Sequence, residues 1–311
     1  MGISTCLLGM PVRYDGGHKL DHYLRDTLGR HVDFVPVCPE VECGFGVPRE
    51  AMRLVGDAES PKLMTTRTKV DLTGRMAAWA SKRVRELEEE GLCGFIFKSG
   101  SPSSGMERVK VYDEKGGGVK NGTGLFARAF MDHFPDVPVE DEGRLHDPVL
   151  RENFIERVFT FYRWSSLIRR ETPRIGAVLM FHTQNKLLIL SHSTRHYREM
   201  GRLVAGGKNM AGRELIRRYG SLLAAAMKMK ATPWKNANVL MHMMGYFKKE
   251  LSSWEKVELL EVIGQYQANL VPLLVPLTLL KHYVRKYDQP YLREQTYLEP
   301  HPLELQLRNH V

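Results

Sequence analysis

Four cysteines are the side chains of this sequence best suited to chemistry. Cys6 and Cys38 each end an apolar run beside glycine or proline, Cys43 comes five residues after Cys38, and Cys93 opens another apolar run. Their spacing forms no disulfide framework, so we expect free thiols, which are candidate metal ligands or nucleophiles. No histidine stands at ligand spacing beside them. Metal binding, thiol chemistry and burial all stay open for Cys6 and Cys38, whereas Cys93 is predicted to be a small buried side chain.

A serine-rich loop, SGSPSSG at residues 99–105, follows the apolar run GFIFK. It combines four serines with two glycines and one proline. A loop of hydroxyls and turn formers at the end of a strand often lies against a ligand. The loop therefore predicts a binding site.

Two acidic residues lie close behind the second cysteine. Glu40 and Glu42 follow Cys38 by two and four positions. Beside a metal or a thiolate, a carboxylate can act as a general base or position a water molecule. The same two residues also suit an exposed loop, and the spacing alone leaves both interpretations open.

Two short segments could bind an anion. RYDGGHK at residues 13–19 is either a polar Asp-Gly turn or a glycine loop that brings Arg13 and backbone N–H groups to an anion. VPRE at residues 47–50 predicts a helix that begins at Pro48. Arg49 and Arg53 would then share one helix face, which suits either a phosphate or solvent.

The elements that must position these residues alternate between strand and helix. Apolar runs at 2–9, 32–38 and 94–98 predict strands, while residues 20–28 and 71–90 carry helical patterns. Such alternation predicts a doubly wound α/β domain with a mainly parallel sheet. Ligands of such sheets bind beyond the carboxyl ends of the strands, so we expect Cys6, Cys38 and the serine loop to converge on one crevice.

The second half of the chain changes character. Strand signals end near Arg163, and helical patterns follow at 175–190, 210–229, 237–247, 254–267 and 273–286. We therefore expect an all-α second domain, with a boundary between Arg163 and Arg174. The predicted division is 1–165 and 166–311.

Composition limits the class of protein. The 311 residues include no apolar run of membrane-spanning length and no secretion signal at the start, and free cysteines fit a reducing cytosol, so we expect a cytoplasmic protein. The net charge of +9 and the pI near 9.3 favour an anionic partner such as a nucleotide or RNA.

Several ordered motifs together resemble a known family. CLLGMPVRYDGGHK, FVPVCPEVECGFGVPRE, GFIFKSGSPSSG and PVEDEGRL resemble the TudS-type thiouracil desulfidases. FHTQNKLLILSHSTRHY, NVLMHMMGYF and PLTLLKHYV resemble the YbgA-like domain often fused behind them. The resemblance spans nearly the whole chain.

The resemblance implies a 4Fe–4S cluster held by three cysteines, with a fourth iron free to bind the sulfur of the substrate. By motif, two ligands are Cys6 and Cys38, and the third belongs in an SPSCG motif that reads SPSSG here, so that Ser104 takes its place. A hydroxyl is a poor substitute for a soft thiolate. Three explanations stay open: an engineered change, a variant whose cluster uses Cys43 or Ser104 itself, or loss of the cluster.

The resemblance also implies a reaction and roles for individual residues. Water would replace the sulfur of a thiolated pyrimidine, such as 4-thiouracil or 4-thiouridine monophosphate, without net redox change. The base would be Glu42 or Glu40, with Glu42 favoured. The expected assisting residues are Ser101, Ser103 and Lys98, and the expected substrate-binding residues are Arg13, Tyr14, Asp15, His18, Lys19 and Arg49.

Two other functions compete with this one. The first is a nucleotide- or RNA-binding protein without a cluster, which the serine at position 104 favours. The second is a thiol oxidoreductase that uses Cys38 and Cys43, although their spacing gives it little support. The helical domain could form a homodimer, cover the active site or deliver RNA.

Overall fold

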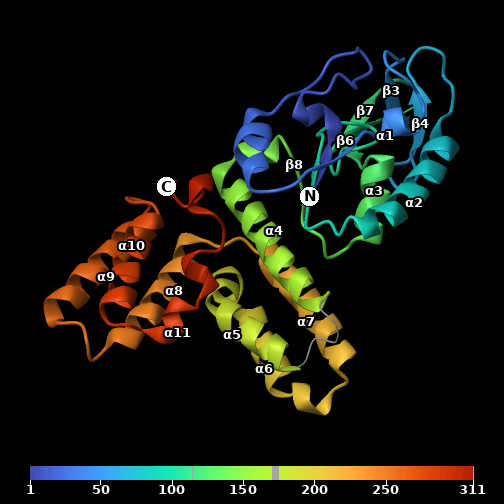
Figure 1. The fold of residues 1–311 in the computed structure, drawn as a ribbon. Helices are drawn as coiled ribbons and strands as arrows, with labels where there is room; N and C mark the ends of the chain where they lie inside the picture. The colour runs from blue at the N-terminus through green and yellow to red at the C-terminus, as the bar shows by residue number, and fades with distance from the viewer. Residues whose placement is uncertain (114, 170–174, 311) are drawn as a thin grey trace. The chain divides into compact units, whose positions relative to one another are not determined.

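The computed structural model describes residues 1–113, 115–169 and 175–310, and it divides into two compact units, Met1–Asp147 and Pro148–Val311 (Figure 1). The division lies earlier than the boundary expected at residue 165, because helix α4 (Pro148–Ile168) packs against helices of the second unit. Part of the expected boundary range, residues 170–174, lies outside the described residues.

The first unit is built on a parallel sheet. Its strands are β1 (Gly2–Ser4), β2 (Val35–Val37), β5 (Phe95–Phe97) and β8 (Val139–Asp141), in the order β2-β1-β5-β8. Every pairing is parallel, with Ile3 opposite Pro36 and Ile96. The chain leaves β1 to form β2 on one side and returns to form β5 on the other, which creates a topological switch point beside β1. The predicted α/β class is confirmed.

Helices cover this sheet. The unit contains α1 (Pro39–Glu42), α2 (Thr73–Glu89) and α3 (Leu125–His133), with short turns of helix at Thr5–Leu8, Tyr23–Thr27, Leu28–Arg30 and Arg144–His146. Phe126 and Phe130 of α3 pack on Phe95 and Phe97 of β5, with ring centres 4.7 to 6.3 Å apart. The helix expected at 71–90 is confirmed, while the one expected at 20–28 is only a π-helical turn and a 3-10 turn.

A second, mixed sheet was not predicted. It consists of β3 (Met52–Val55), β4 (Lys62–Thr65), β6 (Val109–Tyr112) and β7 (Gly118–Gly122), in the order β4-β3-β6-β7, with two antiparallel hairpins joined through a parallel β3–β6 pairing. The helix expected from Pro48 is therefore wrong. The Val47–Pro48 peptide is cis, and Arg53 lies in β3, where its backbone pairs with Met64.

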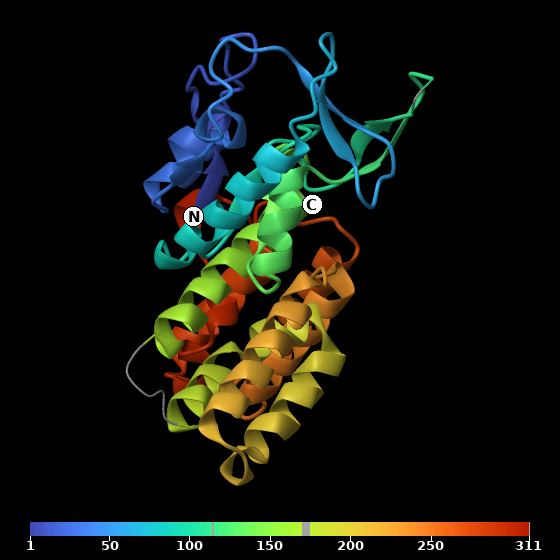
Figure 2. The ribbon, with the colours of Figure 1, turned by 90° about the vertical axis from the view of Figure 1, so that its right-hand side faces the viewer.

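The second unit is helical throughout its described residues, as the sequence predicted. After α4 come α5 (Ile175–His192), α6 (Thr194–Ala205), α7 (Gly212–Lys228), α8 (Pro233–Met244), α9 (Ser253–Gln267), α10 (Leu274–Lys286) and α11 (Pro290–Arg293). Short 3-10 turns lie at Gly207–Asn209, Gly245–Phe247, Thr296–Leu298 and Leu303–Leu305. Helices α5, α6 and α7 lie side by side (Figure 2). No described helix has the length and apolar character to cross a membrane.

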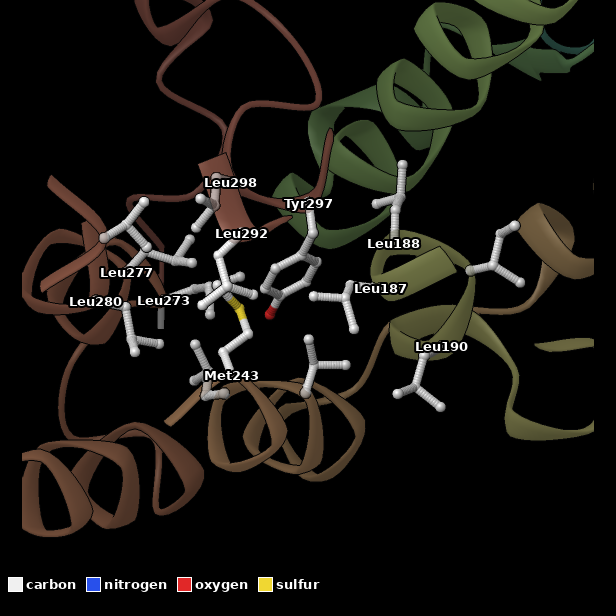
Figure 3. Close-up of a cluster of buried hydrophobic side chains, with 14 of the residues drawn as sticks. Leu187, Leu188, Leu190, Met243, Leu273, Leu277, Leu280, Leu292, Tyr297 and Leu298 are labelled. Carbon is white, nitrogen blue, oxygen red and sulfur yellow. The ribbon is translucent and has the colours of Figure 1, made fainter. Parts of the chain in front are cut away.

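The core of the second unit is apolar with one polar network at its centre. Leu187, Leu292 and Met243 lie around the ring of Tyr297 (Figure 3). The Tyr297 hydroxyl donates to Asn236 Oδ1 at 3.0 Å, and Asn236 Nδ2 donates to the Tyr266 hydroxyl at 2.9 Å. Each of these buried polar groups thus finds a partner, which removes much of the cost of burying it.

Candidate functional site

A cavity of about 350 Å³ opens at the switch point, beyond the carboxyl ends of β1, β2 and β5. Loops from distant parts of the sequence form it, as the strand order requires. The residues that line it are Ser4, Thr5, Cys6, Val12, Arg13, Tyr14, Lys19, Val37, Cys38, Pro39, Glu40, Arg49, Ala51, Met52, Lys98, Ser99, Gly100, Ser101, Pro102 and Ser104.

The three expected metal-ligand positions meet in this cavity. Cys6 follows β1, Cys38 precedes helix α1, and Ser104 lies in the loop after β5, and all three side chains are buried. Burial raises the pKa of the Cys6 thiol to about 11, and burial together with the Glu40 carboxylate raises the pKa of Cys38 to about 12. A metal that bound here would displace these protons, because thiolates are the form that ligates.

The serine loop is folded tightly on itself and on helix α3. Ser101 Oγ accepts hydrogen bonds from the backbone N–H groups of Ser103 (3.3 Å) and Ser104 (3.1 Å). The Ser103 carbonyl accepts from the N–H of Phe126 at 3.0 Å, at the start of α3. A Cβ at Gly124 would come within 2.5 Å of the Ser103 carbonyl, so only glycine permits this approach. The loop thereby holds its hydroxyl groups in fixed positions.

Glu40 is the carboxylate that lines the cavity. Its Oε1 accepts from the Ser103 hydroxyl, which also lies 3.0 Å from the Ser101 hydroxyl. Its Oε2 lies 3.6 Å from Cys38 Sγ and 3.8 Å from a guanidinium nitrogen of Arg49. Glu40 is therefore held between one hydroxyl, a thiol and a cation, with a side chain that is 12% exposed.

Glu42, which the sequence analysis favoured as the base, has a different place. It accepts from the Cys38 backbone N–H at 2.9 Å and pairs with Arg83 Nε at 2.9 Å. Burial raises the pKa of its carboxyl. Glu42 does not line the cavity, and its contacts hold the first turn of α1 in place. The geometry thus favours Glu40 over Glu42 for chemistry in the cavity.

Lys98 lines the cavity from the end of β5 and is held by a residue that the sequence analysis missed. Its ammonium donates to Glu142 Oε1 and to the Ser99 carbonyl, the latter at 2.9 Å. Glu142 also accepts from the Ser99 N–H (2.7 Å) and hydroxyl (2.8 Å). Glu142 follows β8, so the parallel pairing of β8 with β5 brings it here. Its only sequence signal is its place in the motif PVEDEGRL.

The expected substrate-binding residues divide into two groups. Four of them line the cavity: Arg13, Tyr14, Lys19 and Arg49. Asp15 and His18 do not line it. The Asp15 carboxylate accepts a hydrogen bond from the Gly17 backbone N–H at 3.1 Å, and His18 Nδ1 accepts one from the Leu20 backbone N–H at 3.2 Å. Segment 13–19 is therefore both a polar turn and a wall of the cavity, so the two interpretations of it are compatible.

The remaining cysteines lie elsewhere. Cys43 is buried in an apolar cluster with Leu54, Leu63 and Met76, at the far end of α1 from Cys38. Burial raises the pKa of its thiol. Cys93 was predicted to be buried but is only half-buried, because it stands before β5, at the opposite end of that strand from the cavity, and its thiol lies 3.5 Å from the Gly91 carbonyl. Neither residue lines the cavity.

Comparisons with known proteins agree with this architecture. The family model of 2-thiouracil desulfurase matches residues 1–142, and DUF1722, a family of unknown function, matches residues 186–302. YbgA of Escherichia coli (strain K12) is 32% identical over 154 residues, which cover 49% of this chain and 90% of YbgA. YbbK of Bacillus subtilis (strain 168) is 30% identical over 108 residues, which cover 33% of this chain and 71% of YbbK.

A solved structure of the [4Fe-4S]-dependent thiouracil desulfidase TudS is 28% identical, covers 47% of this chain and 93% of its own, and superposes with a TM-score of 0.39. The family match and the fold together identify an α/β domain of the 2-thiouracil desulfurase family, followed by a helical domain. The chain belongs to the family in which a 2-thiouracil desulfurase domain is fused to a YbgA-like domain. At the level of the family, the activity is the desulfuration of thiouracil.

Proposed function

We propose that the first unit removes sulfur from a thiolated pyrimidine by hydrolysis, with 4-thiouridine monophosphate as the preferred substrate and with a 4Fe–4S cluster bound in the cavity. The observation that carries this proposal is the meeting of Cys6, Cys38, Ser104 and Glu40 in one cavity. The three donor side chains come from three strand ends, which suits a cluster that needs one ligand from each. Lys98 and Arg13 line the cavity as cations, each already paired with a carboxylate, Glu142 and Asp15 respectively.

When bound, the cluster would supply a Lewis-acidic iron that takes up the sulfur of the C=S group. The protein residues would position the water molecule and accept its proton. Glu40 is placed to accept a proton from water, because it lines the cavity and contacts with Ser103 and Arg49 fix its two oxygens. The water oxygen forms a bond to the ring carbon, the C–S bond breaks, and sulfide leaves. The products are the uracil compound and hydrogen sulfide, so no oxidant or reductant is needed.

A nucleotide fits the remaining walls of the cavity better than a free base does. Arg13, Lys19 and Arg49 all line the cavity, and a phosphate would add an anionic partner to those that Arg13 and Arg49 already have in Asp15 (3.5 Å) and Glu40 (3.8 Å). Tyr14 is 44% exposed, with the Arg13 guanidinium 5.5 Å from its ring centre, so its other face is available to stack on a flat ring. These contacts would distinguish a phosphorylated substrate from the base alone.

The test is an anaerobic assay of sulfide release from 4-thiouridine monophosphate, 4-thiouridine and 4-thiouracil, on protein whose iron content is known. We expect kcat/KM to fall in that order, with most of the difference in KM, because the phosphate contacts act in binding. Arg49→Gln should reduce the difference in kcat/KM between 4-thiouridine monophosphate and 4-thiouridine. Equal rates on all three compounds would overturn the nucleotide preference, and no sulfide from any would overturn the desulfidase proposal.

A second candidate function, RNA binding by the helical unit, rests on a different observation. Residues 148–311 contain 25 Lys and Arg against 13 Asp and Glu, whereas residues 1–147 contain 20 against 23. An open hollow of about 790 Å³ at α5 and α6 is lined by Lys186, Arg198, Arg202 and Tyr197, and no acidic side chain of the described residues lines it. Cations beside an aromatic ring are typical of single-strand nucleic-acid sites.

Fluorescence anisotropy with a labelled RNA tests this candidate. RNA binding with sulfide release would make the two functions complementary. RNA binding by a protein that holds no iron and releases no sulfide would favour the competing function, a binding protein without a cluster. Absence of RNA binding at low salt would overturn the second candidate.

A further inference from the structure

We propose that Ser104 itself is the third protein ligand of the cluster, so that this chain binds it through two thiolates and one alkoxide oxygen. The inference rests on the proposed function, and it concerns the one position where this chain departs from the motif of the family. Two rivals are a ligand recruited from another cysteine and a site that binds no cluster at all.

Ser104 is already placed as a ligand would be. The residue lines the cavity with Cys6 and Cys38, and it is only 3% exposed. Its backbone N–H is bonded to Ser101 Oγ, and the next residue, Gly105, is packed so closely that a Cβ there would lie 2.4 Å from Val109 Cγ2. The loop therefore cannot shift freely to bring another side chain to this position. Ser104 thus already has its place at the cavity wall before any metal binds.

Recruitment of another thiol would need a larger rearrangement. Cys43 is surrounded by Leu54, Met76 and Val111, so moving it into the cavity would empty part of an apolar cluster. Helix α1 also separates it from Cys38, with Cys38 before the first turn and Cys43 after the last. Cys93 is a full strand away, at the other end of β5. Within the described residues, which include all four cysteines, no third thiol lines the cavity.

Coordination by Ser104 requires only the loss of a proton. The Ser104 O–H bond breaks, the proton goes to solvent, and an O–Fe bond forms, with no electron transferred. A bound cation makes this possible, because it lowers the pKa of an oxygen ligand far below the value in water. Because iron–sulfur clusters prefer soft thiolates, the oxygen ligand should make the cluster easier to strip than a three-thiolate form.

The experiment compares the full chain with three variants after anaerobic reconstitution: Ser104→Cys, Ser104→Ala and, as the matched control for a buried thiol, Cys43→Ala. Iron and acid-labile sulfide per chain, Mössbauer spectra and the rate of iron loss to a chelator are measured. Circular dichroism and thermal unfolding confirm that each variant is folded.

We expect the unchanged chain and Cys43→Ala to hold equal amounts of cluster. Ser104→Ala should lose cluster affinity by on the order of 10–100-fold or more, and Ser104→Cys should lose iron more slowly than the unchanged chain. The Mössbauer spectrum of the unchanged chain should contain one iron site that changes in Ser104→Cys. Equal cluster content in the unchanged chain and Ser104→Ala, or loss of the cluster in Cys43→Ala, would overturn the inference.

The failure of this inference can be told from the failure of the proposed function. If the unchanged chain binds no cluster but Ser104→Cys binds one and releases sulfide, Ser104 is no ligand, while the cavity is still a desulfidase site. If neither form binds iron or releases sulfide, the proposed function fails as well.

Discussion

The two units of this chain differ in how they use charge. The first unit, with 20 basic and 23 acidic residues, has no positive excess, and most of the charged residues that line its cavity are paired with a charge of opposite sign. The second unit, with 25 basic and 13 acidic residues, carries the whole positive excess of the chain. Its hollow at α5 and α6 gathers cations without acidic neighbours among the described lining residues. The basic pI of the protein is therefore evidence about the helical unit and says little about the cavity with the cysteines.

This contrast predicts that catalysis can be removed without touching the second unit. Glu40→Gln keeps the size of the side chain but removes the proton acceptor held by Ser103 and Arg49. We expect kcat to fall by about 10²–10⁴-fold, the usual contribution of a general base, with RNA binding unchanged. The measurement is sulfide release alongside anisotropy. Glu42→Gln is the matched control, and a larger loss of kcat there than in Glu40→Gln would assign the base to Glu42 instead.

Conversely, a substitution in the core of the second unit should lower the stability of the protein and leave the rate of sulfide release unchanged. Arg308 is buried, donates to Glu156 Oε1 at 2.7 Å and to the Tyr297 carbonyl at 2.6 Å, and lies 3.5 Å from Glu152 Oε1. Arg308→Met would remove the guanidinium from the buried Glu156 and the half-buried Glu152 and leave each with a histidine as its partner, so the free energy of unfolding should fall by about 3–5 kcal/mol. Urea denaturation measures this.

The control for Arg308→Met is Arg217→Met, which breaks an exposed ion pair with Glu214 and should cost less than about 1 kcal/mol. If Arg308→Met abolished sulfide release while its second unit stayed folded, the separation of roles between the units would be wrong.

A pair of glycine substitutions tests the packing of the serine loop. Gly124→Ala pushes a methyl group into the Ser103 carbonyl, whereas a methyl group added at Gly74, in the first turn of α2, would meet no heavy atom within 4 Å. We expect Gly124→Ala to cost about 1–3 kcal/mol and to lower cluster content, because the loop must move. Gly74→Ala should stabilise by up to about 1 kcal/mol. Equal thermal unfolding of the two variants would contradict the close approach of Gly124 to the loop.

The basic hollow gives a smaller effect that depends on salt. Replacing Arg198 and Arg202 by Gln should weaken RNA binding at every sequence tested and lower the slope of log K against log salt by about 2, one for each lost phosphate contact. Arg217→Gln is the control, because its partner Glu214 already neutralises it. An unchanged slope in the double variant would place the RNA contact elsewhere.

The smallest effect concerns pH. Burial, and next the charge of Lys186, lower the pKa of His182 to about 4 from an ordinary value of 6.5, and its Nδ1 lies 3.2 Å from the Tyr219 hydroxyl. The folded state thus favours the neutral ring. The stabilisation is complete above pH 6.5 and is lost as the pH falls from about 6.5 toward 4. In His182→Gln, the free energy of unfolding from urea denaturation should change less between pH 6.5 and pH 4 than in the unchanged chain. An equal change in both proteins would refute the lowered pKa of His182.

Sequence reasoning predicted the features that depend on short runs and on chain order. Cys6 and Cys38 end apolar runs, and the strand–helix alternation was sufficient to expect their convergence. The second sheet escaped prediction because Pro48 and the spacing of Arg49 and Arg53 are typical of a helix start, while long-range pairing with β6 decides for a strand. Glu142 was missed because its role depends on the register between β5 and β8. The choice between Glu40 and Glu42 likewise depended on which way α1 turns its side chains.

The three loops that meet at the cavity are separated by long stretches of chain, since they carry residues 6, 38 and 104. A group held by all three is, in polymer terms, a crosslink that closes two large loops in one step. It restricts the unfolded chain as a disulfide would, and it binds only the folded first unit. Loading the site should therefore raise the melting temperature of the first unit and leave that of the helical unit unchanged, so that one broad unfolding transition separates into two.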